Sequence, residues 1–271
     1  MSLETTYLAK EKGMSKSLVI CAALALLAGS VSAEVYYHED FTSDPFAGAT
    51  PWTKVIAGTG GSSAAWSSGK QALWVYSPDK TSQANVYSPT ISGQGTEYEV
   101  KVKFTPSSVP SGDNMGYVLE PMTATGSNRD IVIGLLYSGD SSAKLIIRST
   151  VGADVWNWSY QDALLPMVMG TTYEIKYQRS GQDIQVWGKK AADADWIQLV
   201  NSAGSTTFKL VGGQAADSTF DKFHAGLASI SSRYQVYIDE ITVQDVQVPE
   251  PMTVGLLVTG AAGLLLKRRH A

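Results

Sequence analysis

The chain has 271 residues, of which 25 are acidic, 21 are basic and one is a cysteine. Between two unusual ends, residues 34–248 hold 22 acidic and 15 basic residues, a formal charge of 15 − 22 = −7. This balance argues against nucleic acid as a partner, because nucleic acid selects a basic protein face. The one cysteine, Cys21, lies in the N-terminal segment, so the middle of the chain has neither disulfides nor thiol chemistry.

The first 33 residues follow the order of a secretory signal peptide. Three lysines precede an apolar run from Leu18 to Ala28, and Val31-Ser32-Ala33 supplies the small residues that signal peptidase requires. The apolar run is shorter than the roughly 20 residues that span a bilayer. We therefore predict that residues 1–33 are a signal peptide, that signal peptidase is a partner, and that Glu34 is the mature N-terminus.

Two residues bear on how this segment is processed. Met14 stands just before the last of the three lysines, so it is a second candidate for the true start of the protein. Cys21 follows Ile20, where lipidation of a cysteine requires a small residue. We therefore do not expect a lipid anchor.

Residues 34–247 predict a single all-β domain. Short alternating apolar segments recur between clusters of turn-forming residues, long amphipathic helical windows are almost absent, and no proline-rich or charged linker divides the region. The strands expected are Glu34–Asp40, Ala72–Tyr76, Glu97–Phe104, Gly116–Leu119, Ile131–Tyr137, Ala143–Arg148, Tyr173–Gln178, Ile184–Trp187, Trp196–Leu199, His224–Ala228 and Tyr234–Val243.

The clearest hairpin lies between residues 173 and 187. Tyr173, Ile175 and Tyr177 form one apolar face, and Ser180-Gly181 supplies a turn before the chain returns along Ile184–Trp187. The segment 97–104 has the same alternation, with apolar residues on one face and charged residues on the other. Both patterns predict strands that are buried on one face only.

The order of these elements resembles the concanavalin-A-like (laminin-G-like) jelly-roll sandwiches. The resemblance rests on the hairpin just described, on the strand that bears Trp196, and on the opening Glu39-Asp40-Phe41 with the closing stretch 236–243. It covers most of residues 34–245. It implies a jelly-roll β-sandwich in which the first and last strands pair.

Acidic residues gather on those two terminal strands. Glu39, Asp40 and Asp44 lie at the first strand, and Asp239 and Glu240 lie on its expected neighbour. Calcium binds several oxygen ligands, and carbohydrate-binding sandwiches of this kind hold a structural calcium near this place. The sequence therefore predicts a calcium site built on Glu39, Asp40 and Asp239, unless these acids only cap turns and solvate the sheet edge.

Tryptophans are the candidates for a ligand platform. Trp156 and Trp158 are two residues apart, so in a strand both would project from one face. Sugar rings stack on such faces, and their hydroxyl groups bond to nearby amides and carboxylates. The alternative is that the tryptophans fill the core.

The sequence shows no catalytic constellation, and we expect a non-enzymatic protein. There is no Gly-x-Ser-x-Gly elbow, and His38 and His224 are the histidines of the mature region. Glu97 and Glu99 alternate like the acids of a sugar hydrolase, but they lie on the charged face of a strand, which is typical of a solvated surface.

The last 24 residues combine a rigid break, an apolar helix and a basic end. Pro249-Glu250-Pro251 precedes an apolar run over residues 252–266, and Lys267, Arg268 and Arg269 follow it. This order resembles the PEP-CTERM sorting signal. The resemblance covers residues 248–271 alone and implies recognition and cleavage by an exosortase, after the tail has held the protein at the inner membrane.

Together these features predict an exported cell-surface or extracellular-matrix protein. The resemblance of the tail to PEP-CTERM proteins implies a setting of exopolysaccharide and biofilm production. The sandwich would bind extracellular polysaccharide. The alternatives are a secreted polysaccharide hydrolase or lyase on the same fold, and a structural surface protein without a ligand.

Overall fold

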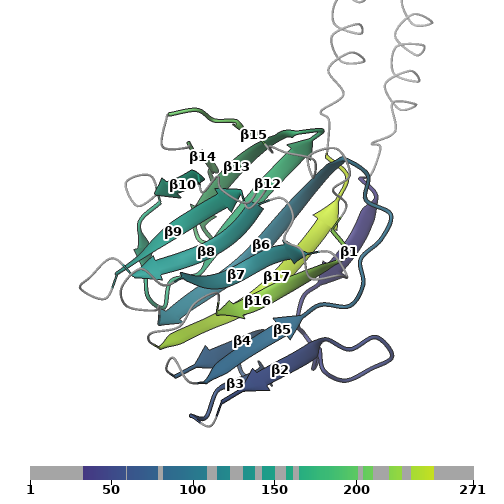
Figure 1. Ribbon diagram of the computed structural model, residues 1–271. Helices are drawn as coiled ribbons and strands as arrows, with labels where there is room; N and C mark the ends of the chain where they lie inside the picture. Colours follow the sequence, from purple (N-terminus) through teal and green to yellow (C-terminus); the bar gives the residue numbers. More distant parts are fainter. Residues whose placement is uncertain are drawn as a thin grey trace, which may run out of the picture. The chain divides into compact units, whose positions relative to one another are not determined.

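The computed structural model describes an all-β protein, which confirms the predicted class (Figure 1). The described residues are 33–58, 60–78, 82–108, 115–122, 131–137, 142–149, 157–160, 165–200, 204–209, 220–227 and 233–246. Residues Glu34–Val246 form one compact unit. Within the described ranges, no helix has the length and apolarity needed to span a membrane.

The first layer is a nine-stranded antiparallel sheet. Its strands run in the order β14 (Ile197–Gln198), β13 (Asp183–Lys190), β12 (Tyr173–Ser180), β6 (Glu97–Ser108), β17 (Tyr234–Gln244), β4 (Ala72–Ser77) and β3 (Ser63–Ser67). Two further strands join this path, β1 (Val35–Glu39) on β17 and β15 (Phe208–Lys209) on β13. The first and last strands of the domain are therefore paired, as expected.

The second layer is an eight-stranded sheet that packs face to face against the first (Figure 1). Its order is β10 (Asn157–Tyr160), β9 (Ser142–Ser149), β8 (Ile131–Tyr137), β7 (Met115–Met122), β16 (Lys222–Leu227), β5 (Gln83–Tyr87) and β2 (Thr53–Ala57), with β11 (Met167–Val168) on β9. The predicted strands all appear, and β2, β3, β5, β10, β11 and β15 are additional to them.

The core lies between the facing sides of the two sheets. In β12 the buried residues Tyr173, Ile175 and Tyr177 alternate with half-buried polar ones, and the buried side chains join a single cluster to which both sheets contribute. Ser180 pairs with Asp183, so the hairpin turn is Gly181-Gln182, one residue beyond the predicted pair. Gly181 has a φ of 60°, which glycine adopts without strain. The remaining face of each sheet points away from this core.

Strand β17 organises the face that concerns function. Along one edge it pairs with β4 over residues 234–238 and with β1 over residues 241–244. The two partners therefore lie end to end, and Asp239 and Glu240 fall in the gap between them. Along its other edge β17 pairs with β6, where Ile238 is opposite Phe104 and Glu240 is opposite Lys103.

Candidate ligand-binding face

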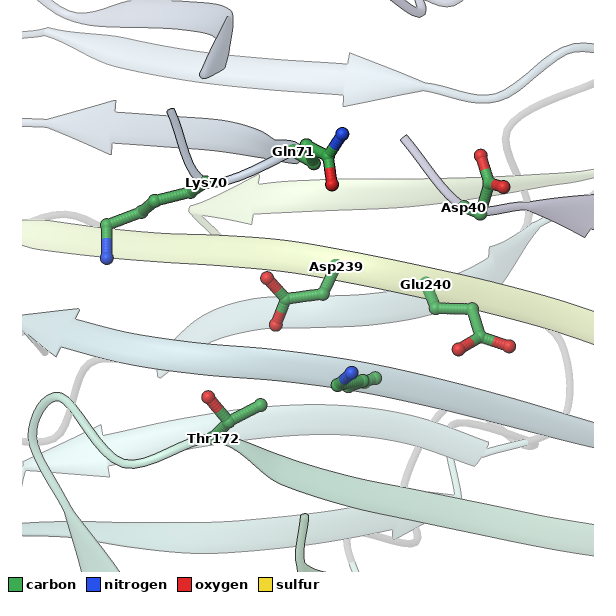
Figure 2. Close-up of a pocket in the computed structure, with 7 residues that line it drawn as sticks. Asp40, Lys70, Gln71, Thr172, Asp239 and Glu240 are labelled. Carbon is green, nitrogen blue, oxygen red and sulfur yellow. The ribbon is translucent and has the colours of Figure 1, made fainter. Parts of the chain in front are cut away.

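A pocket of about 290 Å³ opens on the outward side of the nine-stranded sheet, at the gap along β17 (Figure 2). It is lined entirely by polar and charged residues from five parts of the chain: Asp40, Lys70, Gln71, Lys103, Thr172, Asp239 and Glu240. Asp40 follows β1, and Lys70 and Gln71 precede β4. The pocket therefore exists because β1 and β4 stop short of each other.

A β-bulge places two carboxyl groups side by side in this pocket. The register between β17 and β6 shifts between Ile238 and Glu240, so Asp239 is the extra residue. The burial pattern agrees with this register shift: Ile238 and Ile241 are both in the core, and the two residues between them are half-buried. Figure 2 shows the side chains of Asp239 and Glu240 leaving the strand on the same side.

The carboxyl group of Asp239 has an unusual environment. Burial raises its pKa to about 6, although the ammonium group of Lys103, a hydrogen bond from Thr105 and the charge of Lys70 all lower it. Thr105 Oγ1 lies 3.4 Å from Asp239 Oδ2 and 2.8 Å from Thr172 Oγ1. A carboxyl group that titrates near neutrality inside a pocket is characteristic of functional sites.

The three acidic residues at the first strand differ in their hydrogen-bond partners and in whether they line the pocket. Asp40 accepts hydrogen bonds from the backbone N of Thr42 at 3.0 Å and from its Oγ1 at 2.8 Å, and these bonds lower the pKa of Asp40. Glu39 Oε1 accepts a bond from Phe41 N, and Asp44 caps its own turn at Phe46 N. Of the predicted calcium set, Asp40 and Asp239 line the pocket and Glu39 does not.

The pocket is a poor match for a divalent cation. Lys70 and Lys103 share it with the carboxylates, and a fixed ammonium group beside Asp239 opposes a second positive charge. Across the described ranges, no three His, Cys, Asp or Glu side chains converge as ligands of one ion. Calcium at these residues stays a prediction.

An aromatic row borders the pocket on the same outward face. Trp74 and Tyr76 stack with ring centroids 5.5 Å apart and an interplanar angle of 9°. Tyr237 is the direct cross-strand partner of Trp74, and Lys70 Nζ lies 4.7 Å from the Tyr237 ring centroid. All three rings are half-buried, so each leaves part of its surface open. We call Trp74, Tyr76 and Tyr237 the first aromatic row.

A second aromatic group lies across the same face. Lys176 Nζ is 5.2 Å from the Trp187 ring centroid and 4.9 Å from that of Trp196, and Lys189 Nζ is 5.2 Å from the Trp196 ring centroid. Trp187 and Trp196 are both half-buried. Between the two aromatic groups, the cross-strand neighbours alternate in charge along the series Glu240, Lys103, Glu174 and Lys189.

The ligand platform predicted at Trp156 and Trp158 stays a prediction. Trp156 lies outside the described residues, and Trp158 lies in β10, where it pairs with Arg148. Trp52 is in the core, and Trp66 donates a hydrogen bond from Nε1 to the Phe41 carbonyl at 2.8 Å. The signal peptide, the helix at 252–266 and the sorting residues Pro249, Glu250, Pro251, Lys267, Arg268 and Arg269 also lie outside the described residues.

The outward side of the eight-stranded sheet carries a buried carboxyl–imidazole pair that sequence reasoning missed. His224 Nδ1 lies 2.5 Å from Glu120 Oε2, and His224 Nε2 lies 3.1 Å from Asn85 Oδ1. Tyr87 stacks on the imidazole at 4.9 Å, and Tyr117 meets it edge-on at 5.6 Å. The sequence alone could not predict this pair, because His224 and Glu120 are 104 residues apart in the chain.

Gly226 makes room for this arrangement. A Cβ there would collide with Asn85 Oδ1 and with the Ala84 carbonyl, and Gly226 has a φ of 154° beside a register shift in β16. The missing side chain lets Asn85 lie over β16 and reach the imidazole.

No protein-family model matches the sequence, and no curated protein matches it. Among solved structures, the chain is similar to the CBM2 module of the evolved Dit of Lactobacillus casei BL23 phage J-1, with a TM-score of 0.49 and 8% identity over 80% of this chain and 97% of the module. Domain 4 of AbnA, a GH43 extracellular arabinanase from Geobacillus stearothermophilus in complex with arabinotriose, gives a TM-score of 0.47 and 14% identity over 79% of this chain and 93% of that one.

A third similar structure is xylan beta-1,4-xylosidase from Bacillus halodurans C-125, with a TM-score of 0.43 and 13% identity over 65% of this chain. The match spans only 33% of the length of that enzyme. At these identities and TM-scores, the likenesses carry no conclusion about a ligand or an activity of this chain.

Proposed function

We propose that this is an exported surface or extracellular-matrix protein whose sandwich binds polysaccharide on the outward face of the nine-stranded sheet, without hydrolysing it. Signal peptidase would release Glu34, and an exosortase would process the PEP-CTERM-like tail. We also propose the concanavalin-A-like jelly-roll form for the sandwich, because β1 pairs with β17 within a sheet that faces a second antiparallel sheet.

One observation carries the binding proposal: the first aromatic row lies on a solvent-facing sheet surface, directly beside a wholly polar pocket. The core is complete without these rings, because Leu73, Val75 and Ile238 fill the inward side of the same strands. Large aromatic side chains left on an outward face, next to convergent polar groups, are typical of a ligand site.

The chemistry of the two parts is complementary for a sugar. The rings of Trp74 and Tyr237 offer a flat apolar surface to the C–H face of a pyranose. Lys70 and Lys103 offer hydrogen-bond donors, Asp40, Asp239 and Glu240 offer acceptors, and Gln71 and Thr172 offer both. Hydroxyl groups donate and accept, so a sugar seated across the row and the pocket can satisfy groups of each kind.

The test is a binding measurement on residues 34–248 expressed without either end. Thermal melting and tryptophan fluorescence are followed against a panel of purified polysaccharides, because a ligand that binds only the native state raises the melting temperature. Trp74→Ala should abolish the shift that a binding glycan produces. Ile56→Ala, which removes an exposed apolar side chain from β2 of the other sheet, should leave it unchanged.

If no glycan moves the melting curve, the binding proposal is wrong and a structural surface protein is favoured. If Trp74→Ala and Ile56→Ala both leave a glycan shift intact, the sandwich binds glycan at another place. Each variant needs a melting curve without ligand, so that loss of binding is not confused with loss of fold.

The proposed sorting can be tested separately in an exosortase-bearing host. The chain with Pro249-Glu250-Pro251 changed to alanines should stay with the inner membrane, while the natural chain reaches the surface. Mass spectrometry of the mature protein should place one end at Glu34 and the other near residues 249–251. An intact C-terminus on the surface protein would contradict the role of the tail.

A second candidate function, a polysaccharide hydrolase or lyase, is favoured by the Glu120–His224 pair. A carboxyl group that holds an imidazole in place is a familiar arrangement for acid–base chemistry, and two tyrosines flank it. Release of reducing ends or of unsaturated sugars from the glycan that binds, lost in His224→Gln, would establish this function. Binding without turnover would favour the non-enzymatic one.

A further inference from the structure

We propose that the same face has a second, cationic subsite at Trp187, Trp196, Lys101 and Lys176, and that its ligand is therefore an acidic polysaccharide bound across the strands. This inference rests on the proposed function and gives it a substrate class. The first aromatic row supplies one contact with the chain, and the second subsite supplies the contact that selects charge.

The cross-strand register brings the cationic residues together. Lys101 of β6 is directly opposite Lys176 of β12, and Lys176 is directly opposite Trp187 of β13. The ammonium group of Lys176 lies over the rings of both Trp187 and Trp196. Two lysines and two indoles therefore share one patch of the outward face.

The pairing of two lysines has an energetic cost. Like charges directly opposite each other on neighbouring strands destabilise a sheet. Carboxylates relieve this only in part, because Lys176 Nζ is 3.7 Å from Glu99 Oε2 and the described part of the chain offers Lys101 no ion-pair partner. Both side chains of that pair are mostly covered, with 22% of Lys176 and 9% of Glu99 exposed, so the charge of Lys176 is partly offset and Lys101 carries most of the unbalanced charge. An anionic ligand would relieve the repulsion.

The negative charge of the mature region restricts where an anionic ligand can bind. The mature region is acidic, with a formal charge of −7 from the counts given above. Its field therefore repels anions in general, and an acidic polysaccharide would be retained only where lysines and aromatic rings converge. The lysines supply the charge contact, and the indoles supply the stacking surface.

The distance between the two aromatic groups sets the size of the ligand. Tyr237 lies on β17 and Trp187 on β13, which is three strands further along the sheet order. Strands lie about 4.8 Å apart, and the register carries the Trp187 row through β12 and β6 to Thr242, five residues beyond Tyr237 on β17. The two groups are therefore on the order of 20 Å apart. This exceeds the width of one sugar ring, so the face suits an oligosaccharide that crosses the strands and not a free monosaccharide.

The experiment uses residues 34–248 and three sets of probes: oligogalacturonates from one to six units, the same chains after carboxyl reduction, and sulfated dextran oligosaccharides. Affinity is measured by calorimetry at low and high salt. The acidic hexamers should bind at least ten times more tightly than the neutral one, with an advantage that falls as salt rises. The monomer should bind too weakly to measure. The sulfated probe identifies which acidic group is preferred.

Two variants locate the effect. Lys101→Gln with Lys176→Gln should remove the advantage of the acidic hexamers and leave the affinity of the neutral hexamer unchanged. Lys209→Gln, which removes a charge from an exposed pair with Asp183 outside the patch, is the matched control and should change neither. Trp196→Ala should weaken every hexamer.

The outcomes separate the two proposals. If neutral and acidic hexamers bind equally, and the double lysine variant changes nothing, the cationic subsite is wrong while glycan binding stands. If a neutral glycan binds and no acidic one does, the substrate class is wrong. If no glycan binds at all, both the subsite and the proposed function fall.

Discussion

Gly116 of β7 lies directly beneath the ring of Tyr234 of β17, so the two sheets meet where one of them has no side chain. A Cβ on Gly116 would fall within the contact distance of three ring atoms of Tyr234. The hydroxyl group of Tyr234 then donates a hydrogen bond of 2.8 Å to the Tyr117 carbonyl, beside that glycine.

Gly116→Ala should therefore destabilise the domain. The added methyl group must displace a fully buried ring and strain its hydrogen bond, and overpacking of this kind costs about 1–3 kcal/mol. Urea denaturation gives the free energy of unfolding. Gly69→Ala is the control, because a Cβ there meets nothing within 4 Å. Equal stability of the two variants would contradict the close approach.

Asp239→Asn should stabilise the protein at neutral pH and not at acid pH. Burial raises the pKa of Asp239 from 3.8 to about 6, so only below about pH 3 is its carboxyl group protonated in the folded and unfolded states alike. Between about pH 4 and 6 the unfolded state loses its proton first, and stability falls as pH rises. Asparagine removes that penalty.

The measurement is the difference in unfolding free energy between Asp239→Asn and the natural protein at several pH values. It should be near zero at about pH 3, grow between about pH 4 and 6, and then level off. Asp193→Asn, on an exposed loop, controls for the loss of one charge. A difference that is constant with pH would show that burial does not perturb the carboxyl group.

Glu120 and His224 should show strong energetic coupling. Both side chains are almost wholly buried, and removal of one partner leaves the other without compensation, at a cost on the order of 3 kcal/mol. In a double-mutant cycle, Glu120→Gln and His224→Gln together should cost much less than the sum of the single changes. The pair His38–Thr242, at 3.1 Å and only partly buried, is the comparison and should couple by about 1 kcal/mol or less. Additive effects at Glu120 and His224 would mean that the pair is not a unit.

Millimolar calcium should not raise the melting temperature beyond a magnesium control at equal ionic strength. The reason is the pair of ammonium groups, Lys70 and Lys103, that share the pocket with its carboxylates. A calcium-specific rise that disappears in Asp40→Asn would contradict this expectation and support the predicted site.

Alternation was sufficient to predict the strands that have one buried face. The regular series in 97–104 and 173–178 gave both the strands and their inward residues, and the pairing of the terminal strands followed from the family resemblance. Strand β2 escaped prediction because all five of its residues are exposed, and β3 because it consists mainly of alanine and serine. Neither segment has an alternating pattern to detect.

The pocket was only half predictable. Asp40 and Asp239 were expected to be neighbours, and they line the same pocket. The bulge had a signal in the sequence, because Ile238 and Ile241 are three residues apart where alternation requires two. Lys70, Lys103 and Thr172 could not have been added, since they come from separate elements that only the sheet order brings together. The outward position of the Trp74 and Tyr76 rings was predictable from the sequence, because these residues alternate with the inward residues Leu73 and Val75.

The pairing of β1 with β17 also has a topological consequence. The Asp245 backbone N donates to the Glu34 carbonyl at 2.9 Å, so the two ends of the sandwich touch. A short peptide from residue 246 to residue 34 would close the domain into a ring, which could be reopened at the Gly181-Gln182 turn. The spatial order of the strands would survive this circular permutation, because the sheet depends on which strands are neighbours and not on where the chain begins.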